Sequence, residues 1–430
     1  TMLSREDNEL LTRVGPGTPM GELFRRFWLP AFLPSELPSP DCDPVRIRLL
    51  GEDLVAFRDT MGRVGLLAEG CSHRGASLYF GRNEECGLRC VYHGWKYDVE
   101  GRCVDMPNEP PDTTFKDKVR HPAYPTREWG GVIWAYLGPK DTIPELPQLE
   151  WALAPDTHRR VSKWMLEVNY AQALEGELDS SHVSFLHETF DEESDLPKRQ
   201  VRGDLWKKDR APQLTVQETE YGCLYGSRRN AGNGQHFWRV THWLLPTYAL
   251  LPNPQFPRWS HAYVPIDDYR SWVFDFTFHR DRPLNDAEQA LLEAGSWNTP
   301  RIVPGTFRTL VNKDNDFLLD RDMQRTQNFT GIWGILEQDI AIVHSMGPIC
   351  DRTRERLVPA DVAVITARRV LLRLARQVQQ GAPVHAARHG ELYRVRPLDV
   401  LAVHDDLPGL LDAYREALVA PPGVAQARAG

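Results

Sequence analysis

The sequence predicts an α+β protein with an N-terminal all-β domain and a larger second domain, in which a curved antiparallel sheet is followed by C-terminal helices. Three observations predict this fold class. At 430 residues the chain is too long for one ordinary hydrophobic core. A period of two marks residues 45–68 and returns in long aromatic runs after residue 212. The clearest long amphipathic helix, residues 361–380, comes near the end.

Composition narrows the class of protein. Hydrophobic residues make up 41% and charged residues 26%, as in ordinary globular proteins. The net charge of −8 argues against nucleic-acid binding. No apolar run is long enough to cross a membrane, and the N-terminus lacks the apolar core of a signal peptide. Seven cysteines in so long a chain do not suggest a disulfide framework, so we expect a cytoplasmic protein.

The first domain is predicted to span residues 1–150. It begins with a helical lead-in over residues 4–28, for which Ser4 and Asp7 give a start like a capping box. A small antiparallel sheet, a hairpin and a further strand are then expected. They are predicted at residues 45–68, 96–107 and 130–139.

The second domain is predicted to span residues 151–430. Most of residues 163–190 has the pattern of a helix, and residues 190–212 are expected to form a surface loop or an entrance lid. The aromatic content of the next three β runs is typical of a sheet curved around a cavity. These runs are residues 213–229, 236–251 and 260–280. A helix at 286–295, capped by Asn285 or Asp286, precedes the long helix.

Two short motifs in the first domain have the residue types of a metal site. Cys71-x-His73 and Cys90-x-x-His93 are separated by sixteen residues. Each motif offers one thiolate and one imidazole, and together they supply the ligand set of a Rieske [2Fe–2S] centre. A structural zinc site also accepts two cysteines and two histidines. Zinc motifs usually group like ligands together, whereas each motif here mixes them, so the cluster is favoured.

A second metal site is indicated by Asp179, His182 and His187, arranged as D-x-x-H-x-x-x-x-H. Two histidines and a carboxylate are typical of mononuclear non-haem iron. In a straight α-helix the two histidines would point about 140° apart. They can bind one ion only if the helix ends, or bulges, between them. Ordinary helix histidines are the alternative, but a redox cluster earlier in the chain needs an electron acceptor.

These motifs resemble those of the ring-hydroxylating Rieske non-haem iron oxygenases. The resemblance rests on CSHRG, CVYHGWKY and the D-x-x-H-x-x-x-x-H motif. The segments RVGPGTPMGELFRRFWLP and GLRCVYHGWKYDVEGRCVDMPNEP look like the oxygenase (α) subunits of the phthalate dioxygenase branch. The resemblance implies a Rieske [2Fe–2S] domain followed by a catalytic domain of the helix-grip, START-like type.

The resemblance also implies roles for individual residues. Cys71, His73, Cys90 and His93 hold the cluster, His182 and His187 bind the iron, and Asp179 bridges towards the cluster of a neighbouring subunit. The third iron ligand is a later carboxylate, for which spacing alone leaves several candidates. They are Asp314, Asp316, Asp320, Asp322, Glu337 and Asp339. The segment EQDIAIVHSMGPICDR resembles the ligand helix of the family and favours Asp339.

Two further residues are candidates for substrate binding. Asn169 resembles an active-site asparagine of some family members, although a surface position would suit it as well. Arg239 shares a predicted strand face with Phe237 and Thr241, and an arginine fork suits a carboxylate. A solvent-facing arginine is the alternative for Arg239. Weaker candidates are Arg202, Arg228 and Arg229.

The function implied by the resemblance is cis-dihydroxylation of a phthalate-like or substituted benzoate substrate. O-demethylation of a methoxylated aromatic acid is the alternative within the family, and electron transfer without oxygenase activity is the alternative outside it. The expected cofactors are the [2Fe–2S] cluster, mononuclear Fe(II) and O2, with electrons from NADH delivered by a separate flavin/iron-sulfur reductase. A homotrimer or stacked hexamer is implied, in which His93 of one subunit faces Asp179 of the next.

Overall fold

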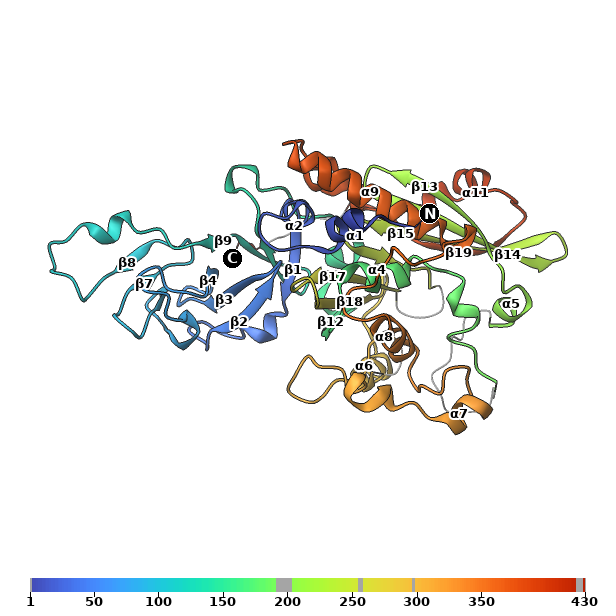
Figure 1. The fold of residues 1–430 in the computed structure, drawn as a ribbon, viewed down its shortest axis with the longest axis horizontal. Coiled ribbons are helices and arrows are strands. Elements are labelled where there is room, and N and C mark those ends of the chain that lie inside the picture. Colours follow the sequence, from blue (N-terminus) through green and yellow to red (C-terminus); the bar gives the residue numbers. More distant parts are fainter. Residues whose placement is uncertain (1, 191–202, 254–257, 296–297, 423–427, 430) are drawn as a thin grey trace.

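The N-terminal part of the chain is all-β, as predicted. The computed structural model describes residues 2–190, 203–253, 258–295, 298–422 and 428–429. Three antiparallel four-stranded sheets form this part at one end of the molecule (Figure 1). In sheet order, the first consists of β1 (Trp28–Phe32), β11 (Val132–Tyr136), β10 (Thr126–Trp129) and β20 (Arg428–Ala429). The second consists of β2 (Val45–Leu49), β3 (Glu52–Arg58), β4 (Val64–Ala68) and β9 (Ala123–Tyr124). The third consists of β5 (Arg82–Glu84), β6 (Gly87–Arg89), β7 (Lys96–Tyr97) and β8 (Cys103–Asp105).

The helical lead-in packs with the second domain. It forms α1 (Arg5–Thr12) and α2 (Pro19–Phe24). The side chain of Ser4 accepts a hydrogen bond from the backbone of Asp7, which confirms the predicted start of the first helix. Both helices pack against α9 (Val362–Gln379), the long C-terminal helix (Figure 1). These two helices therefore contact a helix of the second domain, although the predicted first domain includes them.

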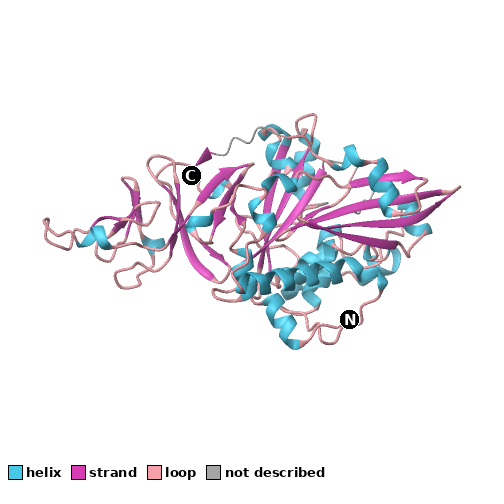
Figure 2. Ribbon diagram, turned by 90° about the horizontal axis from the view of Figure 1, so that it is seen from above, coloured by secondary structure: helices cyan, strands magenta, loops and turns pink. Residues whose placement is uncertain are grey.

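One eight-stranded antiparallel sheet forms the centre of the second domain (Figure 2). The three predicted β runs supply six of its strands, and β19 pairs with β15 beside β16. In sheet order the strands are β12 (Arg159–Leu166), β18 (Ser271–Phe278), β17 (Arg258–Pro265), β16 (Tyr248–Leu250), β15 (Gln235–Leu244), β14 (Gly222–Gly232) and β13 (Gln213–Thr219), with β19 (Leu398–Ala402) off this path.

The prediction that most of residues 163–190 is helical was wrong. The segment begins inside β12, and its only α-helix is α4 (Tyr170–Glu177). All eight residues of β12 pair in register with β18, which is more than 100 residues further along the chain. Such long-range pairing overrides local helical spacing, because a strand is stabilised by its neighbours in the sheet.

The remaining helices cover the sheet or connect its strands. α9 lies against β13 and β14, and Asn285 caps α6 (Asp286–Ala294), as expected. The others are α3 (Glu150–Leu153), α5 (Gly203–Lys208), α7 (Arg321–Thr326), α8 (Ile335–Ser345), α10 (His385–Arg388) and α11 (Leu407–Ala413). The loop predicted over residues 190–212 contains α5, but residues 191–202 lie outside the described part. Within the described ranges no helix has the length and apolarity needed to cross a membrane.

Candidate metal centres and active site

Two loops of the same shape carry the Cys-His motifs. In the first, the backbone N–H of Gly75 donates to the carbonyl of Cys71 at 2.8 Å; in the second, Gly94 donates to Cys90 at 2.9 Å. Gly75 and Gly94 have φ values of +77° and +80°, a conformation in which a side chain would be strained. The glycines therefore let each loop turn back tightly after its cysteine.

The loops bring the four predicted ligands together. The rings of His73 and His93 are 4.5 Å apart, while Cys71 and Cys90 are only 3% and 2% exposed. The Nδ1 atoms of both histidines are buried without a hydrogen-bond partner among the described residues. Buried polar atoms are rarely left unpaired, and ligation of a metal explains these two. Two buried sulfurs and two unpaired imidazoles fit a [2Fe–2S] cluster.

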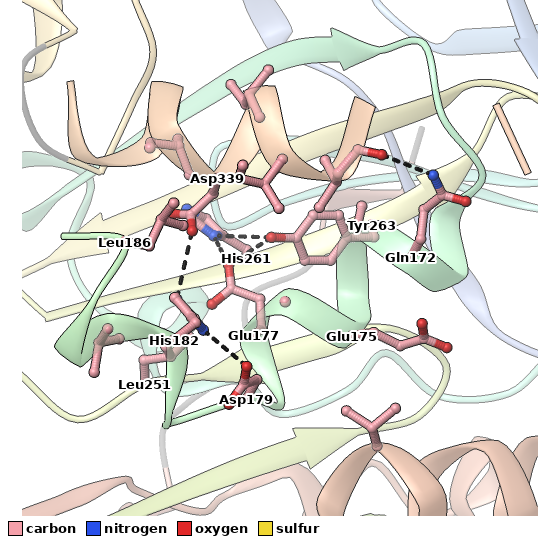
Figure 3. Close-up of a pocket in the computed structure, with 18 of the residues that line it drawn as sticks. Gln172, Glu175, Glu177, Asp179, His182, Leu186, Leu251, His261, Tyr263 and Asp339 are labelled. Carbon is pink, nitrogen blue, oxygen red and sulfur yellow. Dashed lines mark hydrogen bonds and ion pairs between the residues drawn. The ribbon is translucent and has the colours of Figure 1, made fainter. Parts of the chain in front are cut away.

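The second group of predicted ligands lies in the other domain, where the chain leaves α4. His182 begins a short 3-10 turn, His182–Ser184, and His187 follows it. Nε2 of His182 lies 3.5 Å from Oδ1 of Asp339, which is on α8 (Figure 3). Nε2 of His187 lies 3.4 Å from the same oxygen. One ligand atom from each residue lies within 4.8 Å of the others. The donor set fits the two-histidine, one-carboxylate arrangement of non-haem iron.

The predicted interruption of the helix is confirmed, and it begins earlier than expected. α4 ends at Glu177, before Asp179, so neither histidine belongs to an α-helix. The alternative of two ordinary helix histidines is therefore wrong. Within the described ranges, Asp339 is the candidate acid that meets both histidines. Glu337, for example, binds Arg301 at 2.7 Å instead, and Asp320 caps α7.

Neighbouring side chains orient the two iron-site histidines. Oε1 of Gln338 accepts from Nδ1 of His187 at 2.7 Å, which leaves Nε2 of His187 for a metal. Nδ1 of His182 lies 3.5 Å from Oδ2 of Asp179 (Figure 3). Burial would raise the pKa of Asp179, but His182 and the hydrogen bonds from Ser181 lower it to about 2. Asp179 is therefore a carboxylate at any working pH.

A cavity of about 280 Å³ adjoins the iron site. Its wall includes the three iron-site residues and many apolar side chains from the sheet and from α8. Arg239 also lines it and is 7% exposed, so the solvent-facing alternative for Arg239 is wrong. Its Nη2 donates to the carbonyl of Pro252 at 2.8 Å, and its Nε lies 3.5 Å from Oδ2 of Asp399. Burial lowers the pKa of Arg239, and Asp399 opposes this effect.

Both domains match known families. Residues 27–125 match the family described as Rieske [2Fe-2S] domain, and residues 135–397 match the family described as LigXa C-terminal domain like. The phthalate 4,5-dioxygenase oxygenase subunit of Pseudomonas putida is 42% identical over 390 residues, 88% of each chain. The chain belongs to the Rieske non-haem iron oxygenases. The cysteine and histidine motifs of this oxygenase subunit thus lie in a Rieske domain, which decides against structural zinc.

Other relatives of this Rieske oxygenase differ in their named reactions. The 3-chlorobenzoate-3,4-dioxygenase oxygenase subunit of Comamonas testosteroni is 40% identical, over 87% of this chain and 89% of its own. The 5,5'-dehydrodivanillate O-demethylase oxygenase subunit of a Sphingobium species is 32% identical, over 88% and 82%. Dicamba monooxygenase bound to dicamba shares the fold, with a TM-score of 0.56 and 17% identity over 84% of this chain and 99% of its own.

The other substrate candidates that the structure describes, Asn169, Arg228 and Arg229, do not line the cavity of this oxygenase. Asn169 is fully buried and caps α4; its side chain donates to the carbonyls of Thr12 and Asp268, so its place is structural. Arg228 binds Gln213 and the carbonyl of Asp405. Arg229 is buried and donates to the carbonyl of Ser180 at 2.7 Å, behind the iron-site loop. Arg202 lies outside the described residues.

An ion-pair network fixes the helix that leads into the iron site. Glu175 on α4 binds Arg352 at 3.0 Å and Arg368 on α9 at 2.7 Å. Burial would raise the pKa of Glu175, but the two arginines lower it. The network joins α4 to the C-terminal helix, and thereby positions the loop that carries Asp179 and His182.

Sequence reasoning missed four residues around the iron site. Gln338 could have been found, because it adjoins Asp339 in a helix whose neighbouring residues are buried. Glu177 precedes Asp179 by two residues, but nothing in the sequence connects it with His261. Asp399 reaches Arg239 only because β19 pairs with β15.

Proposed function

We propose that this Rieske oxygenase is the terminal oxygenase of a two-component system, and that it cis-dihydroxylates a single-ring aromatic carboxylate of the phthalate or substituted benzoate class. The observation that carries the proposal is the presence, in the wall of one cavity, of both the His182, His187 and Asp339 triad and the buried Arg239. Electron transfer alone would require neither the triad nor the cavity.

We assign the metal ligands by the same proposal. Cys71, His73, Cys90 and His93 would hold the cluster, and His182, His187 and Asp339 would hold mononuclear Fe(II). When bound, these groups supply electrons one at a time and activate O2. The protein residues hold the substrate beside the triad, since all three ligands line the cavity. Gln338 and Asp179 keep the imidazole nitrogens directed at the metal position.

The size and charge of the cavity support the substrate class. A volume of about 280 Å³ is at the small end for ligand cavities and suits a single ring better than a biaryl acid. The guanidinium of Arg239 can bind a carboxylate through paired N–H groups. Two relatives at 40% identity or more are named for the single-ring acids phthalate and 3-chlorobenzoate. O-demethylation of a methoxylated acid is the second candidate, because the Sphingobium relative is named for that reaction.

The electron route in this proposal runs between subunits. The Cys-His loops and α8 lie in different lobes of one chain (Figure 1). Beside His93, Val91 and Tyr92 are exposed apolar residues, 58% and 54% accessible, which suits a subunit contact. The proposed assembly is therefore a head-to-tail homotrimer, single or stacked as a hexamer, in which Asp179 adjoins the His93 of the next subunit. A separate flavin/iron-sulfur reductase would supply electrons from NADH.

Arg239→Met tests the proposed substrate role. The apparent KM for benzoates and phthalates should rise roughly 10- to 100-fold, because a charge-assisted hydrogen bond is lost. The KM for neutral methyl esters should change little. The assay should use a surrogate reductase and identify products, so that a cis-diol is distinguished from a demethylated phenol.

Arg228→Met is the matched control, since Arg228 does not line the cavity. Equal increases in apparent KM for the acids and for their esters would contradict the proposed substrate-binding role of Arg239. A wild-type protein with about two irons per chain instead of three, and no product from any aromatic acid, would contradict the oxygenase function itself.

A further inference from the structure

Besides Arg239 and the iron-site residues, the carboxylate side chain of Glu177 lines the same cavity. Glu177 is the last residue of α4. Oε1 of Glu177 accepts hydrogen bonds from Nδ1 of His261 at 2.6 Å and from the hydroxyl of Tyr263 at 2.5 Å. In Figure 3 the other oxygen of Glu177 points away from Tyr263 and His261. None of the described residues donates a hydrogen bond to that oxygen, Oε2, although Glu177 lines the cavity.

Buried partners fix the position of Glu177 in the cavity wall. His261 is fully buried, and its Nε2 lies 3.4 Å from Oδ1 of Asp275. Burial would lower the pKa of His261, but Glu177 and Asp275 raise it to about 10. Asp275 in turn accepts hydrogen bonds from Thr277 and Asn298. An imidazolium clamped between two carboxylates therefore fixes one oxygen of Glu177 and leaves the other for a ligand.

The cavity lining thus includes both a cation, Arg239, and a hydrogen-bond acceptor, Glu177. A carboxylate on the substrate suits Arg239. A second carboxylate placed near Glu177 would meet like charge in a poorly solvated site, whereas a hydroxyl or amino group could donate to it. Specificity of this kind combines an attraction for one substituent with a repulsion of the other.

We propose that Glu177 is a specificity-determining residue that selects aromatic monocarboxylates bearing a hydrogen-bond donor, a ring hydroxyl or amino group, over dicarboxylates. The inference rests on the proposed function and narrows its substrate class. It separates this oxygenase from a relative named for phthalate, a dicarboxylate.

The test measures anaerobic binding of substrates to the holoenzyme. Hydroxybenzoates should bind roughly 10- to 100-fold more tightly than the corresponding methoxybenzoates, which lack the donor, and more tightly than phthalate isomers. In Glu177→Gln the amide oxygen can still accept from Tyr263 and His261, while an NH2 group replaces the free oxygen. The preference for hydroxybenzoates should fall to within about threefold, and phthalate should bind more tightly than to the wild type.

Glu416→Gln, an exposed change outside the cavity, is the matched control and should leave all affinities unchanged. Tighter wild-type binding of phthalate or methoxybenzoate, or an unaltered ranking in Glu177→Gln, would overturn the inference. If the Glu177→Gln variant loses iron or does not fold, the order of substrate affinities in the wild-type protein tests the inference by itself. Product assays distinguish failure of this inference from failure of the proposed function. Oxidation of aromatic acids with no preference for a hydrogen-bond donor contradicts only the role of Glu177. Absence of oxidation of every aromatic acid contradicts the proposed function.

Discussion

The four candidate cluster ligands lie between residues 71 and 93, whereas the iron-site residues extend from His182 to Asp339. Each cluster loop is closed by its own backbone hydrogen bond and its own glycine. The iron site instead needs the end of α4, a 3-10 turn and α8 to meet, and ion pairs to α9 hold α4 in place. The cluster site is thus a local structure, and the iron site depends on packing across the second domain.

Replacing one ligand in each site should show that the mononuclear iron and the cluster are bound independently of each other. We expect Asp339→Ala to lose mononuclear iron and all turnover while retaining the cluster, so that iron falls from about three to about two per chain. Cys90→Ala should lose the cluster and keep about one iron. Iron analysis and the EPR signal of the reduced cluster measure both. Loss of both metals in Asp339→Ala would show that the sites are not independent.

Asp179→Asn should retain both metals but lower turnover to about one-hundredth or less. A carboxylate beside a metal-binding histidine fixes the orientation of the imidazole and raises its basicity. The amide can still accept hydrogen bonds from Ser181 but lacks the negative charge beside His182. Product formation per electron supplied is the measurement, with the exposed Asp412→Asn as control. Full coupled activity in Asp179→Asn would contradict the proposed bridging role.

Glu175→Gln tests whether the iron site depends on distant packing. We expect a loss of roughly 3 kcal/mol in stability, because Arg352 would keep a buried charge without a carboxylate partner and Arg368 would keep only Glu355. Easier loss of iron to a chelator, with the cluster unaffected, should accompany it. Glu218→Gln, in an exposed pair with Arg369, should cost less than about 1 kcal/mol. Equal effects of the two changes would contradict the dependence on buried ion pairs.

The ion pairs of Glu175 should also make the stability of the protein depend on pH. The pKa of Glu175 in the folded protein lies below its ordinary value of 4.5. Its contribution to stability is therefore complete above pH 4.5 and is lost as the pH falls further. Denaturation curves of the wild type and Glu175→Gln should converge as the solution is acidified.

Tyr97→Phe should have the smallest effect. The hydroxyl of Tyr97 lies 3.2 Å from Sγ of Cys71. Hydrogen bonds to ligand sulfurs help to set cluster potentials, so their removal should shift the reduction potential modestly to more negative values with the cluster intact. A potentiometric titration followed by EPR measures this, with the exposed Tyr92→Phe as control. An unchanged potential would show that the contact does not tune the cluster.

Much of the fold was predictable from local pattern. The all-β first domain, the capped helix after Asn285 and the long helix over residues 361–380 were all expected, because alternation, caps and amphipathic spacing act over a few residues. The helix predicted over residues 163–190 was wrong because β12 takes its conformation from β18, a distant partner. Asn169 was expected near the substrate and instead caps α4.

The sequence by itself determined the cluster motifs and the histidine pair, since both depend on ligand types at short spacing. For the third carboxylate it gave only a preference among six acids, and the tertiary structure brought Asp339 to the histidines. Only the tertiary structure placed Asp399 beside Arg239, and His261 and Tyr263 beside Glu177. The physical reason is that charge and hydrogen bonding act over a few ångströms in space, and sheet pairing decides which distant residues come that close.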